Sequence, residues 1–442
     1  MEVLCAPLEQ SDIDELVSLF PDFTGQLPDE ARFWKKSDLE LFLGSNGQLR
    51  PKEVSKGAQS CPLLSRARQK LAELKISEAS PEYVSWCRHL AGRGGGYSQS
   101  KDPTRDAVIS AASLTTVACS PVESKRTAPA VPKVPVVVPC PKEWCGSNWT
   151  MDFWKAQSQN LWWTCRTRSP AHEHDRRASD MVDVEGSPAD YVDYAKLLQE
   201  KDPGCLEENA VAYPRLVMDG WCPFINAQGR KLLEKHWREL TPPGVKDLSF
   251  KWIKMFTTVF NLDFFDYFAR FYRLSLGAPG CISRLHVTNN GAHTWYTQIE
   301  GRRLFFLFAP QETSNLAEEE GGPVDHLEGY AASVSSVDIF FPHPKRHAAF
   351  AQAKAQVVIL QPGESLIVPS GWWHYAVHLD ASVTLHHPFW ALQNRARMSE
   401  ELREAFIASK MPVELQEMAA RNISQLHERI MEDDDDDSEA EV

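Results

Sequence analysis

The sequence predicts a protein with a mainly β core, a closed sheet or sandwich between about residues 142 and 395, and helices at both ends. Two observations lead to this prediction. Short strand-like runs separated by turn residues follow one another from Leu274 onward. Most of the 14 Trp and 21 Phe residues lie after Trp144, so the main hydrophobic core should form in the same part of the chain.

Residues 1–97 are predicted to form a helical region. Ser11 is a candidate N-cap for a first helix, and Pro28 can begin a second helix that Gly44 ends. The segment from Leu63 to Ile76 has apolar residues at helical spacing and predicts a third helix. No residue pattern in this range suggests catalysis, so we expect a helical module or a partner-binding segment.

A linker is predicted over residues 98–141. Six prolines lie between Pro121 and Pro141 among small and β-branched residues, a composition typical of extended chain without a core of its own. The barrel-like domain is therefore expected over residues 142–395. C-terminal helices should follow over 396–431, and the acidic run at 432–442 should remain solvated and disordered.

Several short strands are predicted in the second half of the chain. The segment from Arg303 to Phe308 is strongly strand-like. Two further runs, Val357 to Leu360 and Ser365 to Val368, flank a Pro-Gly turn. The segment from Val377 to Leu385 is another strand candidate. Short strands at this spacing are typical of a closed sheet or a sandwich.

Charge and composition disfavour several functional classes. A formal net charge of −13 argues against nucleic-acid binding through phosphate contacts. The first residues lack a secretory signal pattern, and no stretch of eighteen apolar residues occurs, so we expect an intracellular protein, cytoplasmic or nuclear. The 10 Cys are scattered, which suits a reducing compartment. Cys140 and Cys145 form a lone C-x4-C pattern, for which ordinary thiols are favoured over a zinc site.

Three segments carry residue types suited to metal or cosubstrate binding. Residues 283–288 include His286, residues 295–303 end in two Arg, and residues 362–374 end in Trp-Trp-His with His374. Taken singly, each pattern is modest, because a lone His is more often structural than a ligand and a Trp pair is more often part of a core. Their order and their separation by β-rich sequence are more specific than any one of them.

Together these segments resemble the JmjC family, also called the cupin-8 type of Fe(II)- and 2-oxoglutarate-dependent oxygenase, and above all its lysyl hydroxylase branch. The resemblance covers roughly residues 149–395 and is strongest from Leu274 to Trp390. It implies a double-stranded β-helix, the jelly-roll of cupin and JmjC proteins. In that fold two His and one carboxylate hold iron and leave positions open for 2-oxoglutarate and oxygen.

The resemblance assigns the metal ligands to His286 and His374, and it puts Thr288 where the family has the carboxylate. A neutral hydroxyl does not offset the charge of a metal ion, so iron affinity should fall. Arg303 stands where the family has a Lys that pairs with the far carboxylate of 2-oxoglutarate. A guanidinium can make the same pair, although its fork is larger.

The resemblance also implies cosubstrate-binding positions at Ser283, Trp295 and His386. Because side chains alternate along a strand, Trp295 and Arg303 are expected on one face. His386 falls at a family Thr, and it can be a replacement ligand, a polar contact or an ordinary histidine near the barrel rim. Leu216 occupies the place of a family Tyr that contacts the cosubstrate.

Three hypotheses follow. The first is an Fe(II)- and 2-oxoglutarate-dependent dioxygenase, of hydroxylase or demethylase type, with an altered metal triad. The second is a catalytically inactive JmjC barrel that acts as a binding or scaffold module. The third is a cupin that binds another metal through His286, His374 and His386. In each case we expect a protein substrate or partner, and the C-terminal helices are candidates for a homodimer interface.

Overall fold

The computed structural model gives the fold of most of residues 131–432 and of three short helices before them. The residues that it describes are 9–28, 31, 36–44, 46, 61–73, 131–158, 161, 163–168, 181–201, 213–288, 291–318, 331–337, 339, 342, 345–398, 400 and 413–432.

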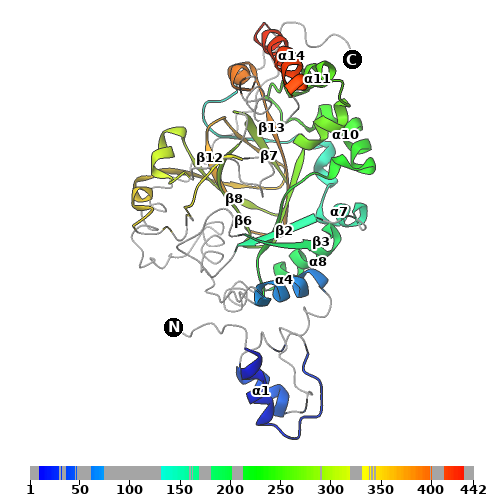
Figure 1. Ribbon diagram of the computed structural model, residues 1–442, viewed down its shortest axis with the longest axis vertical. Coiled ribbons are helices and arrows are strands. Elements are labelled where there is room, and N and C mark those ends of the chain that lie inside the picture. The colour runs from blue at the N-terminus through cyan, green and yellow to red at the C-terminus, as the bar shows by residue number, and fades with distance from the viewer. Residues whose placement is uncertain are drawn as a thin grey trace.

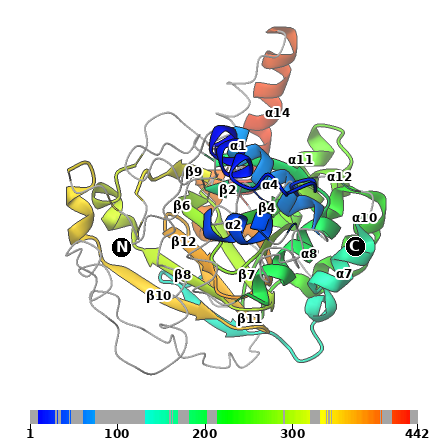
Figure 2. The same cartoon turned by 90° about the horizontal axis from the view of Figure 1, so that it is seen from below.

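The core consists of two antiparallel sheets that face each other in a jelly-roll (Figures 1 and 2). The larger sheet has the strand order β1-β11-β7-β13-β5-β4-β2-β3, and the smaller has the order β10-β8-β12-β6-β9. A mainly β core of the double-stranded β-helix type with flanking helices is therefore confirmed. The strands of the larger sheet are β1 Val136–Pro139, β2 Trp163–Arg168, β3 Met181–Gly186, β4 Leu216–Trp221, β5 Arg273–Gly277, β7 His293–Glu300, β11 Glu364–Val368 and β13 Ser382–Phe389.

The smaller sheet supplies one wall of the barrel. Its strands are β6 Ile282–Thr288, β8 Arg303–Phe308, β9 Ala331–Val334, β10 Ala355–Leu360 and β12 Trp373–His378. Every residue of β8 and β12 is buried, which fits their runs of β-branched, aromatic and apolar residues. Sheets that are covered on both faces read as continuous apolar runs.

Helices cover the outer face of the larger sheet (Figure 1). Their aromatic and aliphatic residues join the main core cluster, which includes Trp154, Tyr191, Leu233 and Trp252. The elements are η2 Cys145–Asn148, α7 Met151–Gln157, α8 Pro188–Gln199, η4 Pro223–Ile225, α10 Ala227–Leu240, α11 Ser249–Val259, α12 Phe264–Phe268 and η5 Ala269–Phe271. Shorter turns lie at η6 Pro310–Asn315, η8 Ala348–Gln352 and η9 Leu392–Asn394. The last helix is α14 Val413–Met431.

The N-terminal helices divide into two groups. Helices α1 Gln10–Ser18 and α2 Lys36–Gly44 share a small cluster of their own. Helix α4 Pro62–Glu73 instead contributes Leu63 and Leu64 to the main core, where it packs against β3 and α8. One detail differs from expectation, because Glu9, not Ser11, occupies the N-cap of α1. Most of the residues between Pro28, the predicted start of the second helix, and Lys36 lie outside the described ranges.

Strand β1 lies at the end of the range expected to be a linker. It pairs with β11, from Val136 opposite Ile367 to Pro139 opposite Glu364, and Val131 and Val137 are buried. The six-proline composition did not reveal this, because an edge strand tolerates Pro where a central strand does not. We therefore propose that the linker ends near residue 130. Residues 74–130 lie outside the described residues.

The prediction of a single strand from Val377 to Leu385 is wrong, because the chain passes from the smaller sheet to the larger sheet within this segment. β12 ends at His378 and β13 begins at Ser382. The corner between them holds Asp380, whose carboxylate accepts hydrogen bonds from the backbone N–H and the guanidinium of Arg302. Arg302 lies in the matching corner between β7 and β8, so this ion pair joins two sheet-to-sheet crossings.

No helix within the described ranges combines the length and the apolar character needed to cross a membrane.

Candidate functional site

The two histidines expected to bind metal lie side by side in the barrel. His286 on β6 and His374 on β12 are directly opposite each other in an antiparallel pair, so their side chains leave the sheet on the same face. Their ring centroids are 4.0 Å apart, and both residues are buried. Residues 88 positions apart thus converge because β6 and β12 are neighbouring strands.

Hydrogen bonds fix the orientation of both imidazoles. Nδ1 of His286 lies 2.7 Å from the carbonyl oxygen of Arg284, and Nδ1 of His374 lies 3.2 Å from that of Trp372. Because a carbonyl only accepts, each Nδ1 carries the proton and donates it. Each Nε2 then carries the lone pair, which is the state of a metal-binding His.

Burial keeps both rings neutral. It lowers the pKa of His286 to about 4, although the nearby carboxylate of Asp219 acts in the opposite direction. Burial, together with the neighbouring ring of His286, lowers the pKa of His374 well below its ordinary value. The pair therefore supplies two uncharged nitrogen donors at neutral pH.

The hydroxyl of Tyr296 forms a hydrogen bond with the lone pair on Nε2 of His374. Tyr296 comes from β7 in the opposite sheet, and its hydroxyl lies 2.7 Å from Nε2 of His374. Since Nδ1 holds the imidazole proton, the phenol donates this hydrogen bond. The same ring stacks on His386, with centroids 5.4 Å apart and planes at 19°. A phenol thus lies between two imidazoles at the place where the resemblance expects a metal ion.

Thr288 supplies no replacement for the missing carboxylate. It is buried, and its hydroxyl is paired with that of Thr294 at 2.7 Å. Within the described residues, no group of three His, Cys, Asp or Glu ligand atoms lies close together in the barrel. The donors there are two neutral imidazoles and a hydroxyl already in a hydrogen bond. This set does not fit Fe(II), which binds two His and one carboxylate in this fold.

Arg303 carries a positive charge into the barrel interior. It is 1% exposed, and it donates a hydrogen bond from Nη2 to the hydroxyl of Ser283. Its Nε and Nη1 are buried and have no hydrogen-bond partner among the residues that the structure describes. Unsatisfied donors on a buried cation are costly, so a water molecule or an anion is expected beside them.

A carboxylate missed in the sequence analysis belongs to the same network. Asp219, at the end of β4, accepts hydrogen bonds from Ser283 at 2.6 Å and from Ser275. Burial alone would raise the pKa of Asp219, but the charges of Arg303 and His386 and the two hydroxyls hold it well below its usual range. Ser283 thereby links the anion of Asp219 to the cation of Arg303.

His386 lies on β13 and faces this interior. Burial lowers its pKa to about 3, against the opposing effect of Asp219. Its contact with Tyr296 makes it part of the polar cluster, in line with the polar-contact alternative. Ser283, Arg303, His286, His374 and His386 are thus brought together by the fold.

Trp295 is not part of this group. Its ring contacts Tyr272 and His387, with centroids 6.2 and 5.6 Å away, in the layer between the larger sheet and the helices. The expectation that Trp295 and Arg303 share a face is wrong, because β7 ends at Glu300 and β8 begins in the other sheet. The change of sheet resets the alternation, and Tyr296 takes the inward position.

The sequence contains a feature that could have indicated Asp219, and Tyr296 is adjacent to a residue that was predicted to line the site. Asp219 is the only charged residue in the strand Leu216–Trp221, and a lone acid in an apolar strand needs a buried partner. Leu216 of the same strand packs in the main core. Tyr296 lay next to a residue that we had singled out, one position away from the correct face.

Residues 240–394 match the family described as the cupin-like domain, in agreement with the jelly-roll core and the paired histidines.

Parts of the chain are also similar to several curated proteins. It is 30% identical over 139 residues to the HSPB1-associated protein 1 homolog of Danio rerio, which is 31% of this chain and 29% of that protein. It is 32% identical over 114 residues to lysine-specific demethylase 8 of Xenopus tropicalis, 26% of this chain and 23% of the relative. It is 30% identical over 100 residues to Jumonji C domain-containing protein 5 of Drosophila melanogaster, 23% of each chain. The aligned parts are thus less than a third of each relative.

Proposed function

We propose that this JmjC-domain protein is a catalytically inactive barrel that acts as a binding or scaffold module. The observation that carries the proposal is the hydrogen bond from Tyr296 to Nε2 of His374, which uses the lone pair that an iron ion would need. Thr288 at the carboxylate position supports the same conclusion, because its hydroxyl neither carries charge nor remains available. The competing hypothesis is the iron-dependent dioxygenase that the resemblance implies.

Two changes separate this barrel from an iron site, and they can be tested separately. Thr288→Asp supplies the missing carboxylate but leaves Tyr296 in place. Thr288→Asp combined with Tyr296→Leu also vacates the position beside His374. Thr288→Asp combined with Tyr296→Phe is the matched control, because it removes the hydroxyl but keeps most of the ring volume.

Iron content and succinate release are measured after anaerobic loading with Fe(II) and addition of 2-oxoglutarate. We expect no bound iron and no succinate from the natural protein. Thr288→Asp alone should gain little, and the Asp and Leu double variant should bind iron. Stoichiometric iron with succinate release in the natural protein would overturn the proposal in favour of the dioxygenase.

We also propose that the barrel interior binds the carboxylate of a small acid at Arg303. Two buried guanidinium nitrogens of Arg303 lack a hydrogen-bond partner among the described residues, and this supports the proposal, because an anion would satisfy both the hydrogen bonds and the charge. 2-Oxoglutarate is the first candidate, since the resemblance places this residue at its far carboxylate. If it binds here, it does so as a ligand held by Arg303 and not as a consumed cosubstrate.

Carboxylate binding is tested by thermal unfolding of the metal-free protein with EDTA present. 2-Oxoglutarate should raise the melting temperature of the natural protein, because a ligand that binds only the folded state stabilises it. Arg303→Lys should retain part of the shift and Arg303→Met should lose it. No shift in the natural protein at millimolar ligand would contradict this part of the proposal.

A protein is the proposed partner of the module. Relatives of this chain are named for association with HSPB1, and the net charge of −13 disfavours nucleic-acid phosphates. Binding of purified HSPB1 to the immobilised full chain tests this, and saturable binding is the expected result. An RNA duplex serves as the control ligand, and a preference for RNA would contradict the proposal.

A further inference from the structure

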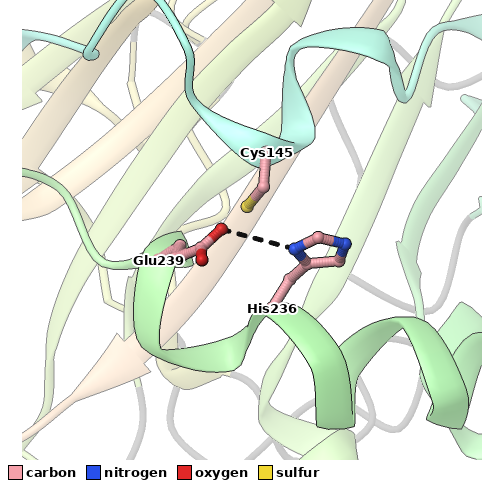
Figure 3. A group of neighbouring side chains, drawn as sticks. All are labelled: Cys145, His236 and Glu239. Carbon is pink, nitrogen blue, oxygen red and sulfur yellow. Dashed lines mark hydrogen bonds and ion pairs between the residues drawn. The ribbon is translucent and has the colours of Figure 1, made fainter.

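A second group of metal-ligand side chains lies outside the barrel interior, between η2 and α10 (Figure 3). Cys145 on η2 faces His236 and Glu239, which project from one side of α10. One ligand atom from each residue lies within 4.8 Å of the other two. Within the described ranges, this is the only place where three such atoms meet.

The local sequence fixes both halves of this group. His236 and Glu239 are three residues apart, a spacing that puts side chains on the same helix face. α10 itself is well anchored, since the Asn226 side chain accepts hydrogen bonds from two backbone N–H groups at its first turn. On the other half, a Cβ on Gly146 would lie 2.3 Å from the ring of Trp144, so only glycine fits after Cys145.

The distance between two of the ligand atoms is compatible with a tetrahedral ion as well as with a direct hydrogen bond. Nδ1 of His236 and Oε2 of Glu239 are 3.4 Å apart, at the long end of hydrogen bonding. Zinc bonds of about 2.0–2.2 Å to nitrogen and oxygen at a tetrahedral angle put two such ligands about 3.4 Å apart. His236 is also held in place by Trp149, whose ring meets the imidazole edge-on.

Charge gives the second argument. Cys145 and Glu239 both ionise to anions, and they lie side by side with the imidazole of His236. A divalent ion that displaces the thiol proton would be held by one thiolate, one carboxylate and one neutral imidazole, so the occupied site would have no net charge.

We propose that Cys145, His236 and Glu239 bind a zinc ion, with water as the fourth ligand. Cys, His and Glu are all zinc donors, and three protein ligands with one open position form a recognised zinc arrangement. The ion would join the segment that follows β1 to α10 at the flank of the barrel (Figures 1 and 2). This inference does not depend on the proposed function, because none of its residues lies in the barrel interior.

Zinc content and cobalt spectroscopy on the full chain test this proposal. The protein is stripped with chelator, reloaded with Zn²⁺ or Co²⁺ and desalted, and the metal is then counted. The variants are Cys145→Ser and His236→Gln. Cys140→Ser is the matched control, because Cys140 belongs to the same C-x4-C pattern but lies beside Ser365, with Sγ 3.2 Å from the hydroxyl.

We expect about one zinc per chain and, with cobalt, a thiolate-to-metal charge-transfer band in the natural protein and in Cys140→Ser. Cys145→Ser should lose the band, and both ligand variants should bind zinc more than about tenfold more weakly, as even loss of an outer-shell partner does. If the natural protein retains no zinc, or if cobalt binds without a thiolate band, the proposal is wrong. The cobalt spectrum of the natural protein decides the matter even if a variant fails to fold.

Discussion

The barrel interior and the Cys145 group both gather metal-ligand side chains, but they differ in the charge that their donors offer a cation. The interior holds buried neutral imidazoles, a phenol and the cation of Arg303, and its nearest acid, Asp219, is bound to serine hydroxyls. The Cys145 group combines a thiol, an imidazole and a carboxylate, and the side chain of Glu239 is 65% exposed.

This difference teaches that a converging pair of histidines does not by itself make a metal site. In the interior, burial keeps each His neutral and therefore a possible donor, but Arg303 adds a positive charge and Tyr296 donates a hydrogen bond to the lone pair of His374. The last two effects oppose a divalent cation. In the Cys145 group, two side chains that ionise to anions lie together, and their charges would balance that of a divalent cation.

The largest expected effect comes from removing the interior cation. Arg303→Met should lower the free energy of unfolding by about 3–5 kcal/mol, because it leaves the charge of Asp219 uncompensated in the interior. The double variant with Asp219→Asn should recover a large part of that loss. Urea unfolding of the single and double variants measures both quantities.

The neighbouring residue provides the control for that prediction. Arg302 also makes an ion pair, with Asp380, but their side chains are 34% and 22% exposed. Arg302→Met should therefore cost only about 1 kcal/mol. Equal losses for the two Arg variants would mean that the interior network has no special role in stability.

Acidification should destabilise the interior next most strongly. The pKa of His286 is about 4 in the folded protein, below its ordinary value of about 6.5, so the neutral ring stabilises the fold above pH 6.5 and this contribution is lost as the pH falls toward 4. The loss for His286 between pH 7 and pH 4.5 should be about 2 kcal/mol. The pKa of His386 is lowered in the same direction, which adds to the effect.

The Cys145 group should instead lower the stability of the metal-free protein as the pH rises. The pKa of Cys145 is raised to about 11, so its neutral thiol favours the metal-free fold below pH 9 and this contribution is lost as the pH rises through 11. Urea unfolding across pH 4.5–10 checks both limbs. His286→Gln should flatten only the acid limb and Cys145→Ser only the alkaline limb. An acid limb unchanged by His286→Gln would show that this ring is not buried as described.

Much of the barrel could be predicted from the sequence. The strand Arg303–Phe308 was located to the residue, and the order of the motifs led to the neighbouring positions of His286 and His374. Local composition determines a strand, and the family likeness supplies the order in which strands pair. The replacement of the carboxylate by Thr288 is likewise readable directly from the sequence.

The contacts that change the chemistry could not be predicted in the same way. Side-chain alternation predicts a face only within one strand. Because the chain crosses from one sheet to the other between β7 and β8, Arg303 lies on the interior side with Tyr296 and not with Trp295. The flank group joins Cys145 to residues 91 and 94 positions later, and no local pattern connects them. Only the packing of η2 against α10 does.

The smallest effect is also the most direct test of what fills the interior. Tyr296→Phe removes one hydrogen bond to a buried imidazole and should lower the free energy of unfolding by about 1 kcal/mol. Tyr191→Phe is the comparison variant, since that phenol is also buried, donates to the carbonyl of Leu216 and accepts from the backbone N–H of Ala278. Its loss should be the larger of the two, because it leaves a buried N–H without its partner.

Only Tyr296→Phe should change the hydrogen bonding of the His374 imidazole. Nitrogen NMR of the imidazoles reports the loss of the hydrogen bond at Nε2, and this resonance should shift in Tyr296→Phe but not in Tyr191→Phe. If the His374 resonance stays the same in both variants, the phenol does not occupy that lone pair. The contrast between the barrel interior and the Cys145 group would then rest on the missing carboxylate and the charge of Arg303 alone.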